Sequence, residues 1–448
     1  MMKRTKITVL FSACLVFVYT ARAQSISTKY DFTIQQCIEY ANKNNVQVKN
    51  ALLAVKIQEQ TNREITASAL PSVSGSFGLT DYVKIPTTLI PAQFFGGPAG
   101  TYEPVQFGTK YNSSASLQLQ QLLFDGQVFV GLQARAASLE YQRKNAEVTQ
   151  ENIKANIHKI YYQLVVSKTQ ISLLDANITR LDKLLHDETI MYKNGFAEKL
   201  DLDKVSVQLA NLQTQKQKAL NSIEIGYLGL KTLMGMPVND TLKLTEEITE
   251  DKIKSDGLVD SGYQYANRKE FQYLDVVKRL NEYNIKRYKL SYYPTVALSG
   301  VYSKQAMRSE FDIFGKGDWF TTSYIGLNIS IPIFDGFAKD SKIGQAKFTL
   351  QQTNNQIDNL KLSIDNDVKQ ARLNFETAIT AINTQKKNME LAESVYNQTK
   401  KKYESGTGSN LEITNAQTDL ISAQTNYISA MYDAVIAKVD YFKAVGKL

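Results

Sequence analysis

Two short stretches of the sequence share residues that could carry chemistry. YKNGFAEKLDL begins at Tyr192, and YESGTGSNLEI begins 211 positions later at Tyr403. Both place an aromatic hydroxyl, a glycine, a leucine and a carboxylate in the same order, between two tracts that are typical of long helices. The carboxylates, Asp201 and Glu412, fall where the second helix of each pair is expected to begin. An acid in that first turn is stabilised by the positive end of the helix dipole.

The glycines of these stretches predict tight reversals of the chain. Gly195 and Gly406 each follow a long tract without glycine or proline, and glycine is the residue that most readily adopts the positive φ of a helix C-terminus. We therefore expect turns at 193–199 and at 404–410. The tyrosines that precede them are expected to pack in the helix seams, and a contact within a gate is the alternative.

The remaining reactive residue types do not form an enzyme site. His158 and His186 are 28 residues apart, which is roughly 40 Å along one helix, so they cannot share a metal ion within one chain. His158 lies two residues from the seam position Ile160 and is expected to be solvated. The sequence contains no Gly-x-Ser-x-Gly, P-loop, His-Glu-x-x-His or Cys-x-x-Cys motif. We expect no enzyme activity, no cofactor and no metal site.

Residues 1–23 have the layout of a secretory signal peptide, with basic residues, an apolar run and a small-residue site, Ala-Arg-Ala. The alternative is a lipoprotein signal processed at Cys14. Removing this segment takes away four basic residues, so the formal charge falls from +8 to +4 and gives no evidence for a nucleic-acid partner. Cys37 is then the only cysteine, which excludes an intramolecular disulfide. Beyond the signal, no apolar run reaches the roughly 20 residues that a transmembrane helix requires.

The chain reads as an internal duplication. SALPSVSGSFGL pairs with SYYPTVALSGVY, LQLQQLLFDG pairs with LNISIPIFDG, and the two Tyr-x-x-Gly elements follow. We place the first repeat at 24–244, a polar linker at 245–262 and the second repeat at 263–448. Each repeat is expected to contain a helix, two strands, a long helix, a tip turn and a last helix: strands at 71–83 and 110–124 and helices at 126–192 and 200–235 in the first, and strands at 294–304 and 323–334 and helices at 336–403 and 411–447 in the second.

The long tracts carry a seven-residue apolar period. Apolar side chains recur along two seams in each repeat, and Glu188 is one of the few polar interruptions. The seams run from Leu132 to Leu181 and from Ala136 to Tyr192 in the first repeat, and from Ile343 to Ala378 and from Val368 to Tyr396 in the second. A heptad period sustained over this length imposes a left-handed supercoil. At about 1.5 Å per residue, a helix over 126–192 is roughly 100 Å long, which suits a rod or the wall of a tunnel. The Asp of each FDG motif, Asp125 or Asp335, is expected to cap the long helix that follows.

The predicted strands alternate large apolar residues with small polar ones. Strands of about ten residues with this pattern are typical of a membrane-spanning barrel with a wet lumen, and a half-buried soluble sheet is the alternative. Four strands cannot close a barrel, and an open edge in lipid leaves backbone groups unpaired at several kcal/mol each. Three copies supply twelve strands, so we predict a homotrimer.

Over essentially the whole mature chain, these features resemble the TolC-type outer-membrane factor family. The resemblance is carried by FTIQQCIEYANKNNVQVKNA near the start, Pro71 and Pro294 at the entries into the strands, both FDG motifs, both Tyr-x-x-Gly turns and LMGMPV at 233–238. It implies an α+β membrane protein that is mostly α. A trimeric twelve-stranded β-barrel, with four strands per chain, would lie in the lipid of the outer membrane of a Gram-negative bacterium. A long α-helical coiled-coil tunnel would continue it into the periplasm, and loops 84–110 and 304–322 would face outside.

The resemblance also implies a function. It is that of the outer-membrane exit duct of a tripartite efflux or type I secretion system, whose partners are a periplasmic adaptor protein and an inner-membrane transporter. Since the sequence has no nucleotide-binding motif, we expect a passive channel that draws its energy from those partners. The sequence does not identify the transported substrate. An exported coiled-coil scaffold or adhesin without channel activity is the alternative.

In the family, the acid of the tip element points into the lumen near the closed tip. That position corresponds to Asp201 and Glu412, so three copies of each would ring the pore with carboxylates and favour cations. The second tip departs from the pattern, because Gly408 stands where the best-known member carries an arginine that helps to lock the closed state. Lys199 is the candidate substitute. The candidate tip and gate residues are Tyr192, Gly195, Lys199, Asp201, Tyr403, Gly406, Gly408 and Glu412.

Overall fold

The computed structural model describes residues 29–254, 262–312, 315 and 317–448. The predicted signal peptide, with Cys14, lies outside the described residues, and so does the stretch 255–261 of the linker. The chain divides into two compact units. We call them the helical unit, within 1–52, 145–272 and 360–448, and the sheet unit, within 53–144 and 273–359.

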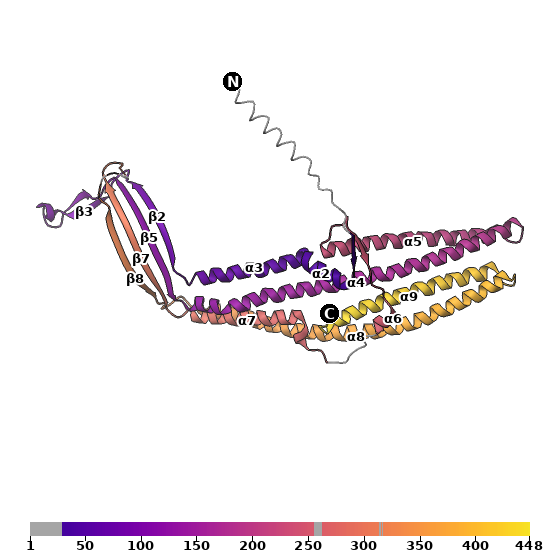
Figure 1. Ribbon diagram of the computed structural model, residues 1–448. Coiled ribbons are helices and arrows are strands. Elements are labelled where there is room, and N and C mark those ends of the chain that lie inside the picture. Colours follow the sequence, from indigo (N-terminus) through magenta and orange to yellow (C-terminus); the bar gives the residue numbers. More distant parts are fainter. Residues whose placement is uncertain (1–28, 255–261, 313–314, 316) are drawn as a thin grey trace, which may run out of the picture. The chain divides into compact units, whose positions relative to one another are not determined.

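The sheet unit is built on a four-stranded antiparallel sheet of order β2-β5-β7-β8 (Figure 1). β7 ends at Arg308 where the sequence predicts 304. β8 ends at Ser330 where the sequence predicts 334, because Pro332 cannot donate a backbone hydrogen bond to a ladder. The strands are β2 (Ser72–Asp81), β5 (Tyr111–Phe124), β7 (Thr295–Arg308) and β8 (Phe320–Ser330).

The register of this sheet separates apolar from polar side chains. On one face, Val73 pairs with Leu119, and Leu298 pairs with Leu327. On the other face, a row of hydroxyl side chains crosses all four strands: Ser76, Ser116, Ser303 and Thr322. Many large residues of the apolar face, such as Val73 and Leu327, are exposed within one copy of the chain, and Ile325 reaches 81%. Leu119 and Leu298 are partly buried.

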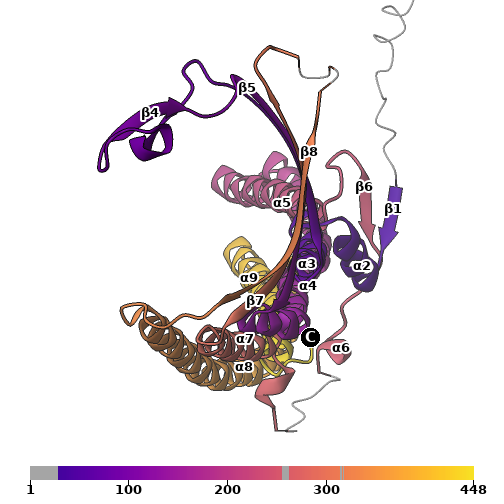
Figure 2. The same ribbon diagram turned by 90° about the vertical axis from the view of Figure 1, so that its left-hand side faces the viewer.

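A short hairpin follows β2 and precedes β5. It consists of β3 (Thr87–Pro91) and β4 (Tyr102–Gln106), which pair antiparallel, and the 3-10 helix η1 (Ala92–Phe95) between them. The sequence predicts a loop over 84–110, because strands of five residues are too short to show an alternation pattern. Figure 2 shows that the hairpin extends on the concave side of the curved sheet.

Four helices flank the sheet along the chain. These are α3 (Val46–Ala67), α4 (Gly126–Lys193), α7 (Lys269–Leu290) and α8 (Ala338–Glu404). The Asp125 carboxylate accepts hydrogen bonds from the backbone amides of Gln127 and Val128, at 2.7 and 3.2 Å. The Asp335 carboxylate accepts one from Lys339 at 3.0 Å. Both predicted caps are confirmed.

The helical unit contains two long hairpins (Figure 1). The last helix of one is α5 (Lys199–Met234), which follows α4, and the last helix of the other is α9 (Asn410–Ala444), which follows α8. α4 has 68 residues, or roughly 100 Å at about 1.5 Å per residue. The predicted seams are confirmed at the buried positions Ile157, Leu164, Leu174 and Leu181 of α4 and Ile364, Ala371, Phe375 and Ile382 of α8.

Smaller elements of the helical unit pack against these hairpins. The strand β1 (Lys29–Phe32) pairs parallel with β6 (Thr241–Leu244), and both are too short to have been read from the sequence. The helix α2 (Ile34–Asn44) begins with a capping box, in which the side chains of Thr33 and Gln36 each accept a hydrogen bond from the backbone amide of the other residue. A five-residue helix, α6 (Glu250–Lys254), lies within the linker.

No helix in the part of the chain that the structure describes combines the length and the hydrophobicity of a membrane span.

Candidate functional site

The two hairpin tips have the same backbone geometry. Gly195 and Gly406 have φ values of 79° and 72°. In the first tip, the amide of Phe196 donates to the carbonyl of Met191 at 2.8 Å, and that of Gly195 donates to Tyr192 at 3.0 Å. The second tip repeats both bonds, from Thr407 and from Gly406. This pair of bonds is the Schellman motif, which satisfies the last carbonyls of a helix and requires a left-handed residue.

The two tip acids, Asp201 and Glu412, lie in the first turns of α5 and α9. Asp201 is partly exposed, and its carboxylate lies 3.6 Å from the Lys204 ammonium. Glu412 is exposed, and its backbone amide donates to the Ser409 hydroxyl at 3.2 Å. Both positions allow the carboxylate to stabilise the helix dipole.

A hydrogen bond joins the two hairpins just above the tips. The Tyr403 hydroxyl, on α8, donates to Oε1 of Glu188, on α4. Glu188 is only 1% exposed, and a buried carboxylate is costly unless donors satisfy it. Burial, the bond to Glu188 and the nearby charges of Asp187 and Asp201 raise the pKa of Tyr403 far above its ordinary value. The hydroxyl therefore stays protonated and remains a donor.

Sequence reasoning missed Glu188 as a site residue. In the heptad pattern this acid is an interruption of the seam, but a buried acid also indicates that a hydrogen-bond donor faces it. The sequence predicts the same packing for the two tip tyrosines, but Tyr192 is 43% exposed while Tyr403 is half-buried. Tyr403 packs against a buried cluster that we call the tip core: Leu174, Leu181, Leu184, Val205, Leu209, Leu212, Tyr396, Ile413, Ala416 and Leu420.

Lys199 and Gly408, the two residues considered in connection with the lock of the closed tip, lie at the two hairpin tips. Lys199 is exposed at the first residue of α5. Gly408 approaches the end of α8 so closely that an added Cβ would lie 3.1 Å from the Cβ of Lys402. A side chain at position 408 would press on that helix end, so this turn suits glycine.

Above the tips, a layer of buried polar side chains connects α4 to α9. The Asn177 amide donates to Oε1 of Gln424 at 2.6 Å, and its carbonyl oxygen accepts from Gln417 at 3.1 Å and from Arg180 at 2.8 Å. Asn177, Gln417 and Gln424 are all buried. Polar groups in a coiled-coil core lower stability but fix which residues face each other.

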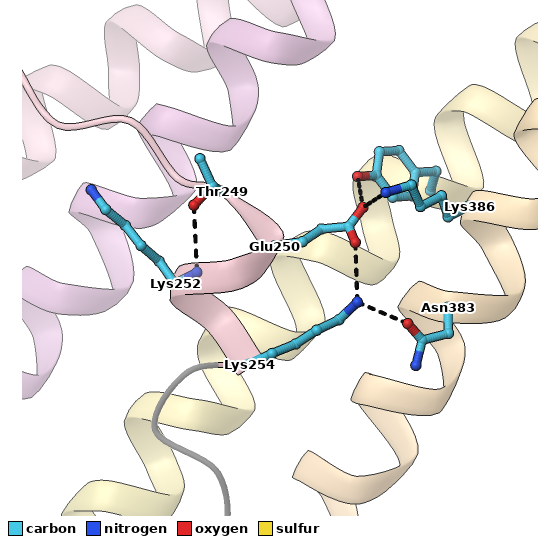
Figure 3. Close-up of polar contacts among 7 residues, drawn as sticks. Thr249, Glu250, Lys252, Lys254, Asn383 and Lys386 are labelled. Carbon is cyan, nitrogen blue, oxygen red and sulfur yellow. Dashed lines mark hydrogen bonds and ion pairs between the residues drawn. The ribbon is translucent and has the colours of Figure 1, made fainter.

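A second polar cluster ties α6 to the α8–α9 hairpin (Figure 3). The Glu250 carboxylate accepts from the Tyr427 hydroxyl at 2.7 Å and lies 3.0 Å from Lys386 and 3.1 Å from Lys254. Lys254 also donates to Asn383 at 2.9 Å. Burial raises the pKa of Glu250, but the hydrogen bonds from Tyr427, Lys386 and Lys254 outweigh it and lower the pKa to about 2.

The expectation for His158 needs correction. The sequence predicts a solvated histidine, but its ring lies 5.9 Å from that of Tyr162 and lines a cavity of about 840 Å³ beside α6 and the end of α9. Burial, aided by the charge of Lys154, lowers the pKa of His158 to about 4. The residues that cover it come from distant parts of the chain, so no local pattern revealed them.

Comparisons with known proteins agree with this architecture. The protein-family model described as 'outer membrane efflux protein' matches residues 266–447. The chain is 22% identical over 347 residues to the outer membrane protein TolC of Salmonella enteritidis, which covers 75% of this chain and 69% of that protein. It is 20% identical over 421 residues to the outer membrane efflux protein BepC of Brucella suis, which covers 93% and 86%. The crystal structure of CusC matches with a TM-score of 0.77 at 15% identity and covers 94% of this chain and 93% of that one.

Proposed function

We propose that the chain is a member of the TolC-type outer membrane efflux protein family, that it lies in the outer membrane of a Gram-negative bacterium, and that it is the exit duct of a tripartite efflux or type I secretion system. Three copies would form a passive channel. A periplasmic adaptor protein and an inner-membrane transporter would supply the cargo and the energy.

The observation that carries this proposal is the sheet β2-β5-β7-β8. Its outer strands, β2 and β8, form its two edges, its apolar face is exposed within one copy, and a hydroxyl row crosses the opposite face. Joining β2 of one copy to β8 of the next would pair both edges, which lipid requires. Three copies would give twelve strands, with the apolar face toward lipid and the polar face toward a lumen.

The hairpin tips support a gated entrance at the periplasmic end. In a tunnel of three copies, the α4–α5 and α8–α9 hairpins would form a wall of twelve helices, and Asp201 and Glu412 would place carboxylates around the tip. The bond between Tyr403 and Glu188 holds two hairpins together, so we assign it to the closed state. Opening would break this bond and move the hairpins apart.

The proposal is tested on the full chain expressed in a Gram-negative host. We expect detergent-dependent extraction from the outer membrane, a trimer of about 140 kDa after loss of the signals, and ion conductance in planar bilayers. Extraction by salt or alkali, with no conductance, would instead support the exported scaffold or adhesin.

A further inference from the structure

The β3–β4 hairpin presents an apolar surface that the function proposed above does not use. In its register Leu89 pairs with Pro104, and Pro91 pairs with Tyr102, so these four side chains share one face. Phe94 and Phe95 extend the surface at the tip of the hairpin, with 79% and 63% of their areas exposed. We call these six residues the hairpin surface. Glu103 pairs with Ile90 on the opposite face.

The tip of this hairpin is ordered by its own hydrogen bonds. The Ala92 amide donates to the Thr101 carbonyl at 2.8 Å, and the Gly97 amide donates to the Ala92 carbonyl at 2.9 Å. Ala92 is buried, and a Cβ at Gly97 would lie 2.8 Å from the Ala92 Cβ. A two-stranded hairpin alone is only marginally stable in water, and clustered exposed apolar side chains indicate an interaction site. The ordered backbone and the bare surface together call for a partner that covers it.

The direction of the hairpin narrows the choice of partner. It extends on the concave side of the sheet (Figure 2). When curved sheets close into a barrel, the concave side becomes the inside, so the hairpin lies over the channel mouth and away from the lipid-facing side. This step rests on the trimeric barrel proposed above. The helices α3 and α4 join the opposite ends of β2 and β5, so this mouth is the external one.

We infer that the hairpin surfaces of three copies of this chain pack against one another across the external mouth and form an apolar constriction there. Around a three-fold axis each residue meets its own copies, so a charged surface would repel itself. The hairpin surface carries Leu, Pro, Phe and Tyr and no ionisable group that is charged at neutral pH, while Glu103 faces away. A second copy of this chain is therefore its occupant.

Disulfide cross-linking tests the contact directly. Phe95→Cys is introduced into the full chain, oxidised in isolated outer membranes and run on a non-reducing gel. The native Cys37 is fully buried, and burial raises its pKa to about 12, so it stays unreactive. We expect a cross-linked dimer band that a reductant removes. The matched control, Glu103→Cys on the opposite face, is expected to give no such band.

A second measurement keeps the inference testable if the introduced thiols are badly oriented. Leu89→Ser, Phe94→Ser and Phe95→Ser are combined, and the variant is expected to remain trimeric with a higher single-channel conductance, because the constriction is removed. A trimer with neither cross-link nor conductance change overturns the inference and leaves the exit-duct function standing. If the unmodified protein is not a trimer, the exit-duct function itself is overturned. The thiol of Phe95→Cys can also be labelled with a membrane-impermeant maleimide. If it is protected in membranes but reacts once lipid is replaced by detergent, the hairpin surface contacts lipid, and the inference is overturned.

Discussion

In the trimeric channel proposed above, the hydrogen bond between Tyr403 and Glu188 should stabilise the closed state by an amount that can be worked out from its chemistry. Tyr403→Phe keeps the ring in the tip core but removes the donor, so Glu188, which is 1% exposed, loses the hydroxyl that the structure places on its Oε1. Movement of the hairpins lets water reach that carboxylate. The substitution therefore raises the energy of the closed state more than that of the open state.

The magnitude follows from the chemistry of the bond. A hydrogen bond to a charged group contributes about 1.5–3 kcal/mol, so each copy should lose about 2 kcal/mol of closed-state stability. Three equivalent bonds that break together would lose about 6 kcal/mol. Since 1.4 kcal/mol is a tenfold change in an equilibrium constant, the ratio of open to closed channels should rise by at least about tenfold.

The assay is the open probability of single trimers in planar bilayers. Tyr192→Phe is the matched control, because Tyr192 holds the same place in the first tip but is 43% exposed, and it should behave like the unmodified protein. Burial and Glu188 raise the pKa of Tyr403, so its contribution is fully present below its unfolded pKa of about 10 and is lost only as pH rises above it. The effect should therefore be constant between about pH 6 and 9.

A double-mutant cycle separates the bond from general damage to the core. Glu188→Leu combined with Tyr403→Phe removes the buried charge together with its donor, and such paired replacements can be nearly neutral. The double variant should close better than Tyr403→Phe alone. The reasoning is refuted if Tyr403→Phe forms a normal trimer whose open probability equals that of the unmodified protein.

Four further predictions concern the stability of the folded protein, measured by thermal unfolding in detergent. Glu250 has its pKa lowered from 4.5 to about 2, so its contribution is present above pH 4.5 and disappears toward pH 2; Glu250→Gln should flatten that acid limb and cost about 1–2 kcal/mol at pH 7. The pKa of His158 is lowered from 6.5 to about 4, so as the pH falls through this range the unfolded chain binds a proton at this histidine before the folded chain does, and the free energy of unfolding falls. His158→Gln should remove this pH dependence between about pH 6.5 and 4, and an unchanged pH dependence would contradict the burial of His158. Gly406→Ala should destabilise by about 1–2 kcal/mol because φ is positive, whereas Gly229→Ala, within α5 and with open space around it, should stabilise by about 0.5–1 kcal/mol; effects of equal sign would refute the turn argument. Asn177→Leu should cost about 1–3 kcal/mol because Gln417 and Arg180 lose their acceptor, and it fails as a prediction if stability rises.

The sequence was most informative where a period repeats many times. The alternation between Tyr111 and Phe124 and the heptad positions from Ile157 to Leu181 identify elements whose burial depends on their own spacing. A strand or helix of this length has a strong pattern because each turn or pleat adds one more agreement. For this reason the four long strands, the long helices and the positions of the tip turns could be read directly.

Contacts between distant segments could not be read in the same way. Glu188 and Tyr403 are 215 residues apart, and Glu250 and Tyr427 are 177 apart. Which residues face each other depends on how the hairpins pack, which a single sequence does not encode in any local pattern. His158 shows the same limit, because its cover comes from α6 and the end of α9. The β3–β4 hairpin was missed for a different reason, since five-residue strands interrupted by proline give little alternation.

The unequal surroundings of Tyr192 and Tyr403 bear on the symmetry of the entrance. Two matching turns per chain would permit a sixfold ring in which every neighbour is alike. The second tyrosine donates to a buried carboxylate, whereas the first is 43% exposed. A ring of three copies would have two kinds of boundary between hairpins. The Tyr403–Glu188 hydrogen bond stabilises the boundary within a copy, and it does not act across the boundary between copies. Opening should therefore begin at the three boundaries between copies, and the Tyr403–Glu188 bonds within the copies should break in a later step of the same opening.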